Sequence, residues 1–255
     1  MRRPATAVVL AAGCGSRLGS ASGRTKCLTE VGRATLLAHT MGALVGRVER
    51  AVLVAGHERD AVADAAVALA SDRMPIDVVD NRRFRETGTA ESLRLALAAV
   101  AVDSDALIIE ADVLFEPRIL EIVVSSPFPT VTVVDDWRPE SSGTVAVVRD
   151  SRVIAWVHES RRPAGFSPER HHKTVNITRV GHDVWSSRLT TLLDGVVREL
   201  GERSPLEYAF ERLVSADPAL VHAVPVDGCK WWEVDTPDDL VVARALFAQV
   251  VRPSY

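Results

Sequence analysis

Residues 7–18 read AVVLAAGCGSRL, an apolar run followed at once by a loop that contains Gly13 and Gly15. The run predicts a short buried strand. Glycines carry no Cβ atom, so the backbone N–H groups of such a loop can approach an anion closely. Arg17 and, further along the chain, Lys26 add positive charge. A strand, a glycine loop and two cations together predict a site for a nucleoside triphosphate.

Two familiar phosphate-binding loops do not fit this segment. The Walker pattern is absent, because Gly19 and Gly23 are followed by the residues RTK at 24–26. The dinucleotide pattern G-x-G-x-x-G fails because Leu18 stands where the third glycine belongs. A glycine pair after a strand is weak evidence by itself, since many turns contain glycine. An oxidoreductase is therefore disfavoured, and the remaining landmarks must identify the chemistry.

Composition excludes several classes of protein. The net charge of −4 over 255 residues provides no basic field for a nucleic acid or an anionic membrane. No apolar run reaches the length of a membrane span, and the N-terminus lacks the apolar region of a secretory signal. Three cysteines without metal-ligand spacing indicate a reducing compartment, so we expect a cytoplasmic protein. The oligomeric state stays open, with a homodimer as one option.

Apolar runs alternate with amphipathic stretches in the first half of the chain. This order predicts an α/β fold with a doubly wound, mostly parallel sheet and helices on both faces. The second half is less regular and predicts an antiparallel extension, with a polar loop at 160–173 as a candidate mobile lid. The expected strands are 7–12, 50–55, 76–79, 105–111, 130–134, 143–148, 153–157 and 220–226, and the expected helices are 36–45, 61–70, 90–100, 188–200, 205–214 and 237–250.

Three segments resemble one family of enzymes. The run LAAGCGSRL at 10–18, followed by Lys26 and Leu28, resembles the loop of nucleotidyltransferases that join a nucleoside triphosphate to a phosphorylated small molecule. The segments IIEADV at 108–113 and WEVDTPDDL at 232–240 resemble the two metal-binding segments of that family, in the same order. The resemblance implies a Rossmann-like nucleotidyltransferase fold in one domain, residues 1–255. A nucleotide-binding half would cover about 1–130, and a smaller mixed acceptor-binding lobe about 131–255.

The resemblance also assigns roles to individual residues. Arg17 would brace the β- and γ-phosphates, and Lys26 would contact the α-phosphate as negative charge develops, so both are candidate catalytic residues. Asp112 and Asp235 would hold Mg²⁺, although Asp235 also suits the start of the last helix. Thr89 has a similar alternative as a helix cap. The expected nucleotide-binding residues are Leu10, Ala11, Ala12, Gly13, Cys14, Gly15, Ser16, Arg17, Asn81, Gly88, Thr89 and Ala90.

The type of acceptor within this family is indicated by smaller differences in sequence. Sugar-1-phosphate enzymes of the family carry a Glu-Lys-Pro-like segment, and here Glu159 is present without the lysine. The sequence AD at 111–112 and KTVNI at 173–177 are closer to bacterial phosphocholine and phosphonate cytidylyltransferases. The resemblance therefore implies CTP as donor and a small phosphonate or phosphomonoester as acceptor. The expected acceptor-binding residues are Trp137, Glu159, Lys173, Asn176, Trp232 and Glu233.

Two features of the sequence point to different acceptors. Trp137 and Trp232 could form part of an aromatic cage for a quaternary ammonium. The loop 160–173 instead carries several cations, which favours an acceptor with an anionic end. A sugar-1-phosphate enzyme that uses UTP, GTP or dTTP stays as the alternative within the class. A non-catalytic nucleotide-binding regulatory protein is the alternative from another class, and the presence of all four predicted catalytic and metal residues argues against it.

Overall fold

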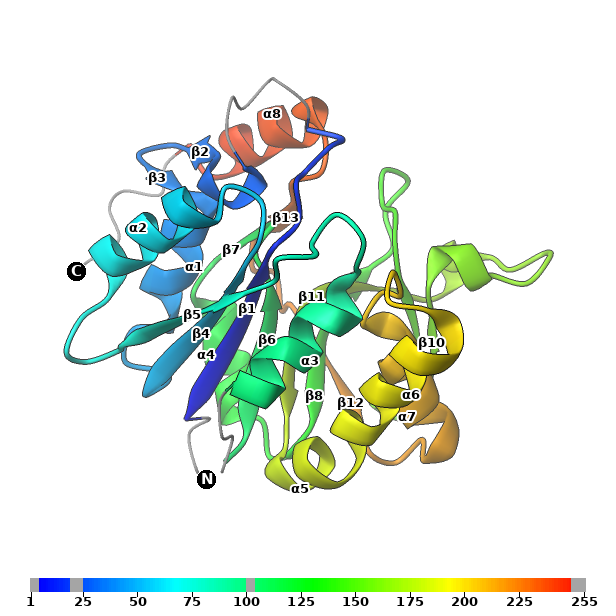
Figure 1. The fold of residues 1–255 in the computed structure, drawn as a ribbon. Helices are drawn as coiled ribbons and strands as arrows, with labels where there is room; N and C mark the ends of the chain where they lie inside the picture. The colour runs from blue at the N-terminus through cyan, green and yellow to red at the C-terminus, as the bar shows by residue number, and fades with distance from the viewer. Residues whose placement is uncertain (1–4, 19–24, 100–103, 249–255) are drawn as a thin grey trace.

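A nine-stranded mixed sheet crosses the molecule (Figure 1). The computed structural model describes residues 5–18, 25–99 and 104–248. The strands, in chain order, are β1 (Thr6–Ala11), β4 (Arg50–Ala55), β5 (Ile76–Asp80), β6 (Ala106–Glu110), β8 (Val131–Asp136), β9 (Val145–Arg149), β10 (Arg152–Val157), β11 (His172–Val180) and β12 (His222–Pro225). Across the sheet they follow the order β5-β4-β1-β6-β11-β8-β12-β10-β9. The sheet therefore draws strands from both halves of the chain, while the functional division near residue 130 stays a prediction.

The first half of the sheet is parallel, which confirms the predicted α/β class. β1 pairs in parallel with β4 on one side and β6 on the other, so that Val8 lies between Val52 and Ile108. All three side chains are buried. Fully buried parallel strands are continuous apolar runs in the sequence. The strands in this half of the sheet could therefore be predicted from the sequence.

The second half of the sheet differs in one respect from the expected antiparallel extension. β11 is antiparallel to both β6 and β8, but β12 runs parallel to β8. Between β11 and β12 the chain passes through the helices α6 (Thr190–Leu200) and α7 (Glu207–Ala216). After them, β12 runs in the direction opposite to β11. Parallel neighbours such as β8 and β12 need a long connection along the chain. The sequence pattern did not indicate which strand would lie beside β8.

Helices cover both faces of the sheet. Val9 and Leu53 pack with Met41 on one face, and Val8 and Val52 pack with Leu93 on the other. Alternate residues of a strand point to opposite faces, so each central strand serves two cores. Of the described helices, none has the length and apolarity to cross a membrane. The remaining helices are α1 (Leu36–Leu44), α2 (Arg59–Leu69), α3 (Thr89–Ala99), α4 (Arg118–Ser125), α5 (His182–Val184) and α8 (Pro237–Leu246).

A small two-stranded sheet brings the C-terminal segment to the end of β6. β7 (Val113–Phe115) pairs with β13 (Trp231–Glu233), and the backbone N–H of Val234 donates to the carbonyl of Asp112 at 2.9 Å. α8 then begins with a capping box between Thr236 and Asp239. Neither β7 nor β13 was predicted, because strands of three residues leave no clear pattern. They nevertheless fix the position of Asp235 relative to Asp112.

Gly88 is required by close packing just before α3. A Cβ atom on Gly88 would lie 2.3 Å from the carbonyl oxygen of Ser204 and 2.5 Å from that of Arg203. We expect Gly88→Ala to lower the free energy of unfolding by about 1–3 kcal/mol, because backbone must shift to admit the methyl group. Urea unfolding measures the loss. Gly13→Ala is the control, since a Cβ there meets nothing within 4 Å. An unchanged urea midpoint for Gly88→Ala would mean that the backbone at Arg203 and Ser204 can shift without a cost in stability.

Candidate active site

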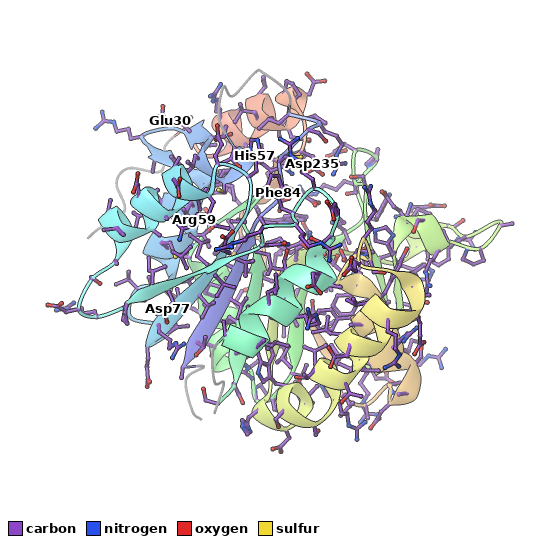
Figure 2. All side chains as sticks on the ribbon, viewed as in Figure 1. Glu30, His57, Arg59, Asp77, Phe84 and Asp235 are labelled. Atoms are coloured by element: carbon purple, nitrogen blue, oxygen red, sulfur yellow. The ribbon has the colours of Figure 1, made fainter. Side chains whose placement is uncertain are left out.

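The predicted glycine loop follows β1 at the carboxyl edge of the sheet. Gly15 has a φ of 60°, and a Cβ atom on it would lie 2.8 Å from the Cβ of Lys26. Glycine therefore permits both the turn and the close approach of Lys26. His57 and Phe84 lie at the same end of the molecule as Asp235, far from Asp77 (Figure 2). A cavity of about 120 Å³ beside the loop is lined by Leu10, Ala11, Gly13, Gly15, Lys26, Cys27, Thr89, Glu110, Ala111 and Asp112.

Lys26 joins the two predicted metal aspartates. Its Nζ lies 3.0 Å from Oδ2 of Asp112 and also forms an ion pair with Asp235. Burial opposes the charge on Lys26, but the two carboxylates outweigh burial and raise its pKa. Arg17, which is largely exposed, contacts the other oxygen of Asp235 at 3.0 Å. Four residues from distant parts of the chain thus form one cluster of fixed charges.

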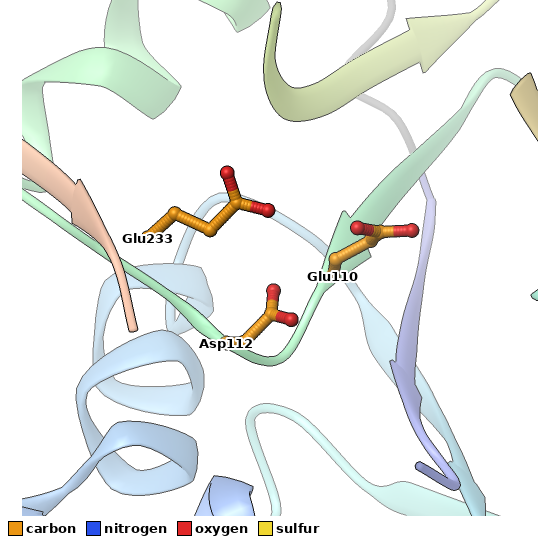
Figure 3. Close-up of side chains that lie close together, drawn as sticks. All are labelled: Glu110, Asp112 and Glu233. Carbon is orange, nitrogen blue, oxygen red and sulfur yellow. The ribbon is translucent and has the colours of Figure 1, made fainter. Parts of the chain in front are cut away.

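A second acidic cluster overlaps the first at Asp112. Glu110, Asp112 and Glu233 each place one carboxylate oxygen within 4.8 Å of the others (Figure 3). Oδ1 of Asp112 is buried and has no hydrogen-bond partner among the described residues. Carboxylate oxygens are the ligands that Mg²⁺ prefers, and an unsatisfied buried oxygen fits a bound cation. The described residues therefore include an acidic cluster that could hold a divalent ion.

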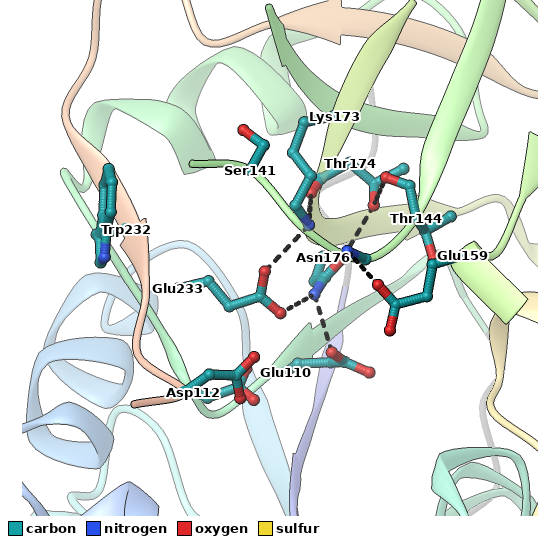
Figure 4. A network of polar contacts seen from close by, with 12 residues as sticks. Glu110, Asp112, Ser141, Thr144, Glu159, Lys173, Thr174, Asn176, Trp232 and Glu233 are labelled. Carbon is teal, nitrogen blue, oxygen red and sulfur yellow. Dashed lines mark hydrogen bonds and ion pairs between the residues drawn. The ribbon is translucent and has the colours of Figure 1, made fainter. Parts of the chain in front are cut away.

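A polar network orients the acidic side chains (Figure 4). Asn176 donates from Nδ2 to Glu110 at 3.0 Å and to Glu233 at 3.3 Å. Its φ of 60° is unusual for a residue within a strand, and it coincides with an irregularity in the pairing of β11 with β8. The buried Lys173 contacts Oε2 of Glu233 at 3.0 Å. Asn176, Lys173 and Glu233, all expected from the sequence to meet the acceptor, therefore lie together.

A larger cavity adjoins the nucleotide-side cavity. It measures about 230 Å³ and shares Thr89, Glu110 and Asp112 with the smaller one. Glu159, expected at the acceptor, accepts a hydrogen bond from the backbone N–H of Gly143 at 2.9 Å. The further lining residues are Arg17, Ser142, Gly143, Thr144, His158, Glu159, Lys173, Asn176, Pro205, Glu207, Glu233 and Asp235.

Several predicted nucleotide-binding residues also build the loops around the site. Asn81 is buried, and its Nδ2 donates to Thr87 and Ser92, each at 3.0 Å. Thr89 accepts a hydrogen bond from the backbone N–H of Leu206 at 2.9 Å while it lines both cavities. Asn81 thus organises the loop before α3. The rest of the set divides between core and surface: Ala12 and Ala90 are buried, whereas Cys14 and Ser16 are exposed.

Neither of the two tryptophans expected to form an aromatic cage is among the described residues that line the larger cavity. Trp137 packs beneath Arg162, whose guanidinium carbon is 5.0 Å from the ring centroid. Trp232 donates from Nε1 to Asp239 at 3.2 Å and lines a cavity of about 50 Å³ that shares Ser142, Lys173, Glu233 and Asp235 with the larger one. No tryptophan is among the described residues that line the larger cavity.

Sequence reasoning did not single out Glu110 or Glu207. Glu110 stands two positions before Asp112, and the alternation of side chains along a strand could have placed the two on one face. Glu207 begins α7 far along the chain, and no local pattern connects it with the other lining residues. Burial, followed by the charge of Glu207, raises the pKa of Glu110 well above its usual value. Both glutamates line the larger cavity.

The cysteines provide a probe of the glycine loop. Cys14 is exposed, whereas Cys27 is buried and burial raises its pKa to about 12. At pH 8 we expect iodoacetamide to modify Cys14 first, since the thiolate is the reactive form and must be accessible. Bound CTP at ten times its Kd should slow this reaction about tenfold, because only the free protein reacts. Cys14→Ser is the control that removes the fast label. An unchanged labelling rate with saturating nucleotide would place Cys14 away from the bound phosphates.

Two cavities that meet at fixed cations and carboxylates, at the carboxyl edge of a parallel sheet, define the chain as a nucleotidyltransferase. Residues 7–135 match the MobA-like NTP transferase domain, and the chain belongs to that family. Among curated proteins it is 33% identical over 239 residues to CMP-5'-(3-aminopropyl)phosphonate synthase of Streptomyces rubellomurinus, covering 92% of this chain and 38% of that protein. It is 23% identical over 242 residues to the bifunctional protein GlmU of Methanococcus maripaludis, covering 94% of this chain and 54% of that protein. The chain thus spans about two fifths to one half of these relatives.

Solved structures support the fold assignment. The inositol-1-phosphate CTP transferase of T. maritima superposes with a TM-score of 0.76 at 21% identity, covering 98% of this chain and 99% of that one. CTP:phosphocholine cytidylyltransferase of Streptococcus pneumoniae gives a TM-score of 0.74 at 14% identity, with 95% and 98% coverage. Both likenesses extend over nearly the whole chain, and the nucleotidyltransferase fold predicted from the sequence is confirmed.

Proposed function

We propose that the chain transfers CMP from CTP to a small phosphonate or phosphomonoester acceptor and releases pyrophosphate. The observation that carries this proposal is the meeting of two cavities at Thr89, Glu110 and Asp112. The smaller cavity adjoins the glycine loop and would receive the triphosphate. The larger cavity would receive the acceptor, and Lys26 lines the smaller cavity at its border with the larger one, beside Asp112 and Asp235.

The reaction asks little covalent chemistry of the protein. An oxygen of the acceptor phosphonate or phosphate attacks the α-phosphorus of CTP, and the bond to the β-phosphate oxygen breaks as pyrophosphate leaves. The attacking oxygen is already anionic, so no general base is needed. The barrier comes from repulsion between anions and from misalignment, and fixed cations lower both.

Lys26 and Arg17 supply those fixed cations. Lys26 remains protonated because Asp112 and Asp235 stabilise its charge. Its ammonium would turn toward the α-phosphate once nucleotide enters, while the exposed Arg17 would reach the β- and γ-phosphates. The glycine loop would add backbone N–H groups on the same side. Each of these groups acts by position and charge.

Magnesium is the proposed cofactor. Asp112 belongs both to the pair expected from the sequence and to the acidic cluster, so it is the proposed principal ligand, with Asp235 as its partner. The ion would supply positive charge that offsets the negative charge building up during the transfer. The orphaned Oδ1 of Asp112 supports this assignment. Glu110 and Glu233 lie close enough to hold the ion or its water molecules.

CTP and a phosphonate-type acceptor are favoured by the activities for which similar proteins are named. The Streptomyces protein is named for a CMP-phosphonate product, and two superposed structures are CTP-dependent transferases. A sugar-1-phosphate acceptor with another nucleotide is the second candidate. It is favoured by Glu159 and Asn176, which could hold hydroxyl groups, and by the likeness to UDP-glucose pyrophosphorylase at a TM-score of 0.75 and 12% identity.

Pyrophosphate release tests the proposal. The assay pairs each of the four nucleoside triphosphates with phosphocholine, aminoalkyl and hydroxyalkyl phosphonates, and several sugar-1-phosphates, with Mg²⁺ present. Turnover with CTP and a phosphonate or phosphomonoester supports the proposed reaction. Turnover confined to UTP, GTP or dTTP with a sugar phosphate would replace it by the second candidate. CTP binding without turnover for any pair would favour the regulatory alternative.

A further inference from the structure

Two segments outside the helices and strands of the main sheet meet beside the larger cavity at Gly143. The first is the connecting loop, residues 137–144, between β8 and β9, and the second is the segment 158–162, which follows β10. The connecting loop supplies three consecutive lining residues of the cavity, Ser142, Gly143 and Thr144. Part of the cavity wall is therefore a loop, and the shape of the cavity depends on what holds that loop in place.

Both backbone groups of Gly143 are held by the segment 158–162. Its N–H donates to Oε2 of Glu159 at 2.9 Å, and its carbonyl accepts a hydrogen bond from the guanidinium of Arg162. The same guanidinium lies over the ring of Trp137, with its central carbon 5.0 Å from the ring centroid. Arg162 thus contacts the connecting loop near both of its ends. Hydrogen bonds to ionised groups are stronger than those between neutral groups, so this clamp is well suited to fix the loop.

The segment 158–162 is itself fixed to α7. Arg161 pairs with Glu211 at 2.9 Å, and its guanidinium carbon lies 4.1 Å from the ring centroid of Tyr208. The hydroxyl of Ser160 lies 2.9 Å from the hydroxyl of Tyr208, within hydrogen-bond distance. The first residue of α7 also lines the larger cavity. The segment therefore ties the connecting loop to a helix that forms another part of the same wall.

Arg162 does not itself line the larger cavity. It is not among the described lining residues, whereas Glu159 is. The sequence associated the basic residues of the loop 160–173 with an anionic end of the acceptor. Of those residues, Lys173 is the one that lines the cavity in the described part of the chain, and it contacts Glu233. Any effect of Arg162 on the acceptor must therefore pass through the connecting loop.

We propose that Arg162 is a positioning residue for the acceptor, which acts by holding the connecting loop in the conformation that lines the larger cavity, with Glu159 as the second half of the clamp. The inference rests on the proposed function, which assigns this cavity to the acceptor. A loop that is already ordered does not have to be ordered when the acceptor binds, so its clamp increases acceptor affinity. The clamp lowers KM for the acceptor and leaves the chemical step nearly unchanged.

Arg162→Ala tests this role through the separate kinetic constants. We expect KM for the acceptor to rise about 10- to 100-fold, the range given by a hydrogen bond to a charged group. The kcat and the Kd of CTP should change by less than about threefold, as for a substitution away from the reacting groups. Arg162→Lys, which keeps a cationic donor, should recover part of the loss. Pyrophosphate release with CTP and 2-hydroxyethylphosphonate gives KM and kcat, calorimetric titration gives the Kd, and thermal unfolding verifies that each variant is folded.

A double-mutant cycle separates the clamp from a direct contact, because Glu159 lines the cavity as well. If Glu159 and Arg162 act through the same loop, either single loss releases it. The double variant Glu159→Ala/Arg162→Ala should then have a KM for the acceptor close to that of the weaker-binding single variant. Effects that multiply in the double variant would mean that Glu159 contacts the acceptor by itself, and would overturn the shared clamp.

Hydrogen exchange at the amide of Gly143, followed by NMR, tests the clamp without turnover. Arg162→Ala leaves Glu159, the acceptor of this amide, in place, so faster exchange in this variant reports release of the whole connecting loop. We expect exchange at least about tenfold faster than in the wild type. Arg170→Ala is the control, since Arg170 is exposed and outside the described lining of the cavity, and it should keep wild-type exchange and KM.

The possible failures are distinguishable. Unchanged exchange at Gly143, or an unchanged KM for the acceptor, in Arg162→Ala would overturn the positioning role and leave the transfer reaction standing. Turnover confined to UTP and glucose-1-phosphate would overturn the proposed function. The clamp would then be judged by KM for glucose-1-phosphate and by the exchange rate, with the same expected changes.

Discussion

Lys26→Ala is expected to lower kcat by about 10²- to 10³-fold, the range found when one preorganised donor to a developing charge is removed. CTP affinity should fall far less, because the ammonium of Lys26 acts mainly as negative charge builds at the α-phosphate. The glycine loop and Arg17 remain in place to bind the triphosphate. Single-turnover kinetics and CTP titration on the same preparation separate the two effects.

The chain offers a matched control for this substitution. Lys230 is exposed, and among the residues that the structure describes its Nζ makes one long contact, of 3.4 Å, with the carbonyl of Leu246. Lys230→Ala should keep wild-type turnover. Lys26→Met, which retains most of the aliphatic stem, should be as inactive as Lys26→Ala and reveals whether packing contributes. If CTP affinity fell in parallel with kcat, Lys26 would be a binding residue without a special role in the transition state.

Asp112→Asn is expected to move the magnesium dependence to much higher concentration. The amide keeps the shape of the side chain but loses the charge that attracts the cation. Even groups that only support metal ligands usually contribute about 10- to 100-fold in metal affinity, so the shift should be at least this large. A magnesium titration of turnover at saturating CTP measures it, and Mn²⁺ binding to the free protein provides a readout that does not depend on activity.

Asp238 is the matched control for this second prediction. It is an exposed carboxylate in the first turn of α8, three residues from Asp235. Asp238→Asn should leave the magnesium titration unchanged, whereas Asp235→Asn should shift it in the same direction as Asp112→Asn. Wild-type magnesium dependence in Asp112→Asn would exclude Asp112 from the metal site. The acidic cluster would then have to bind the ion through Glu110 and Glu233, or not at all.

The nucleotide side of the site could be predicted from the sequence because its residues are close together in the chain. β1, the glycine loop and Lys26 lie within about twenty residues of one another, and the buried apolar run before the loop fixes where the loop emerges. Lys26 reaches Asp112 because β1 and β6 are neighbours in the sheet. The alternating order of strands and helices predicted a parallel sheet, whose strands end at one common edge. Resemblance to a known family then supplied the partner aspartates.

The acceptor side was harder to predict from the sequence, because its residues come from segments that are far apart in the chain and meet only in the folded protein. Glu159 follows β10, Asn176 lies within β11, Glu207 begins α7 and Glu233 ends β13. Their convergence depends on the parallel placement of β12 beside β8 and on the small β7–β13 sheet, neither of which has a strong local pattern. That Trp137 and Trp232 act together at the acceptor stays a prediction: Trp137 packs beneath Arg162, and Trp232 donates to Asp239.

The sequence by itself determined the fold class, the glycine loop and the two cations beside it. These follow from local rules: apolar periodicity, the missing Cβ of glycine and the order of strands and helices. The tertiary structure alone decided that Lys26 lies between Asp112 and Asp235, and that Glu110, Glu159 and Glu207 line one cavity. Which charges remain unpaired depends on contacts between residues far apart in the chain. Those contacts are set by strand order and loop packing, so they become visible only once the chain is folded.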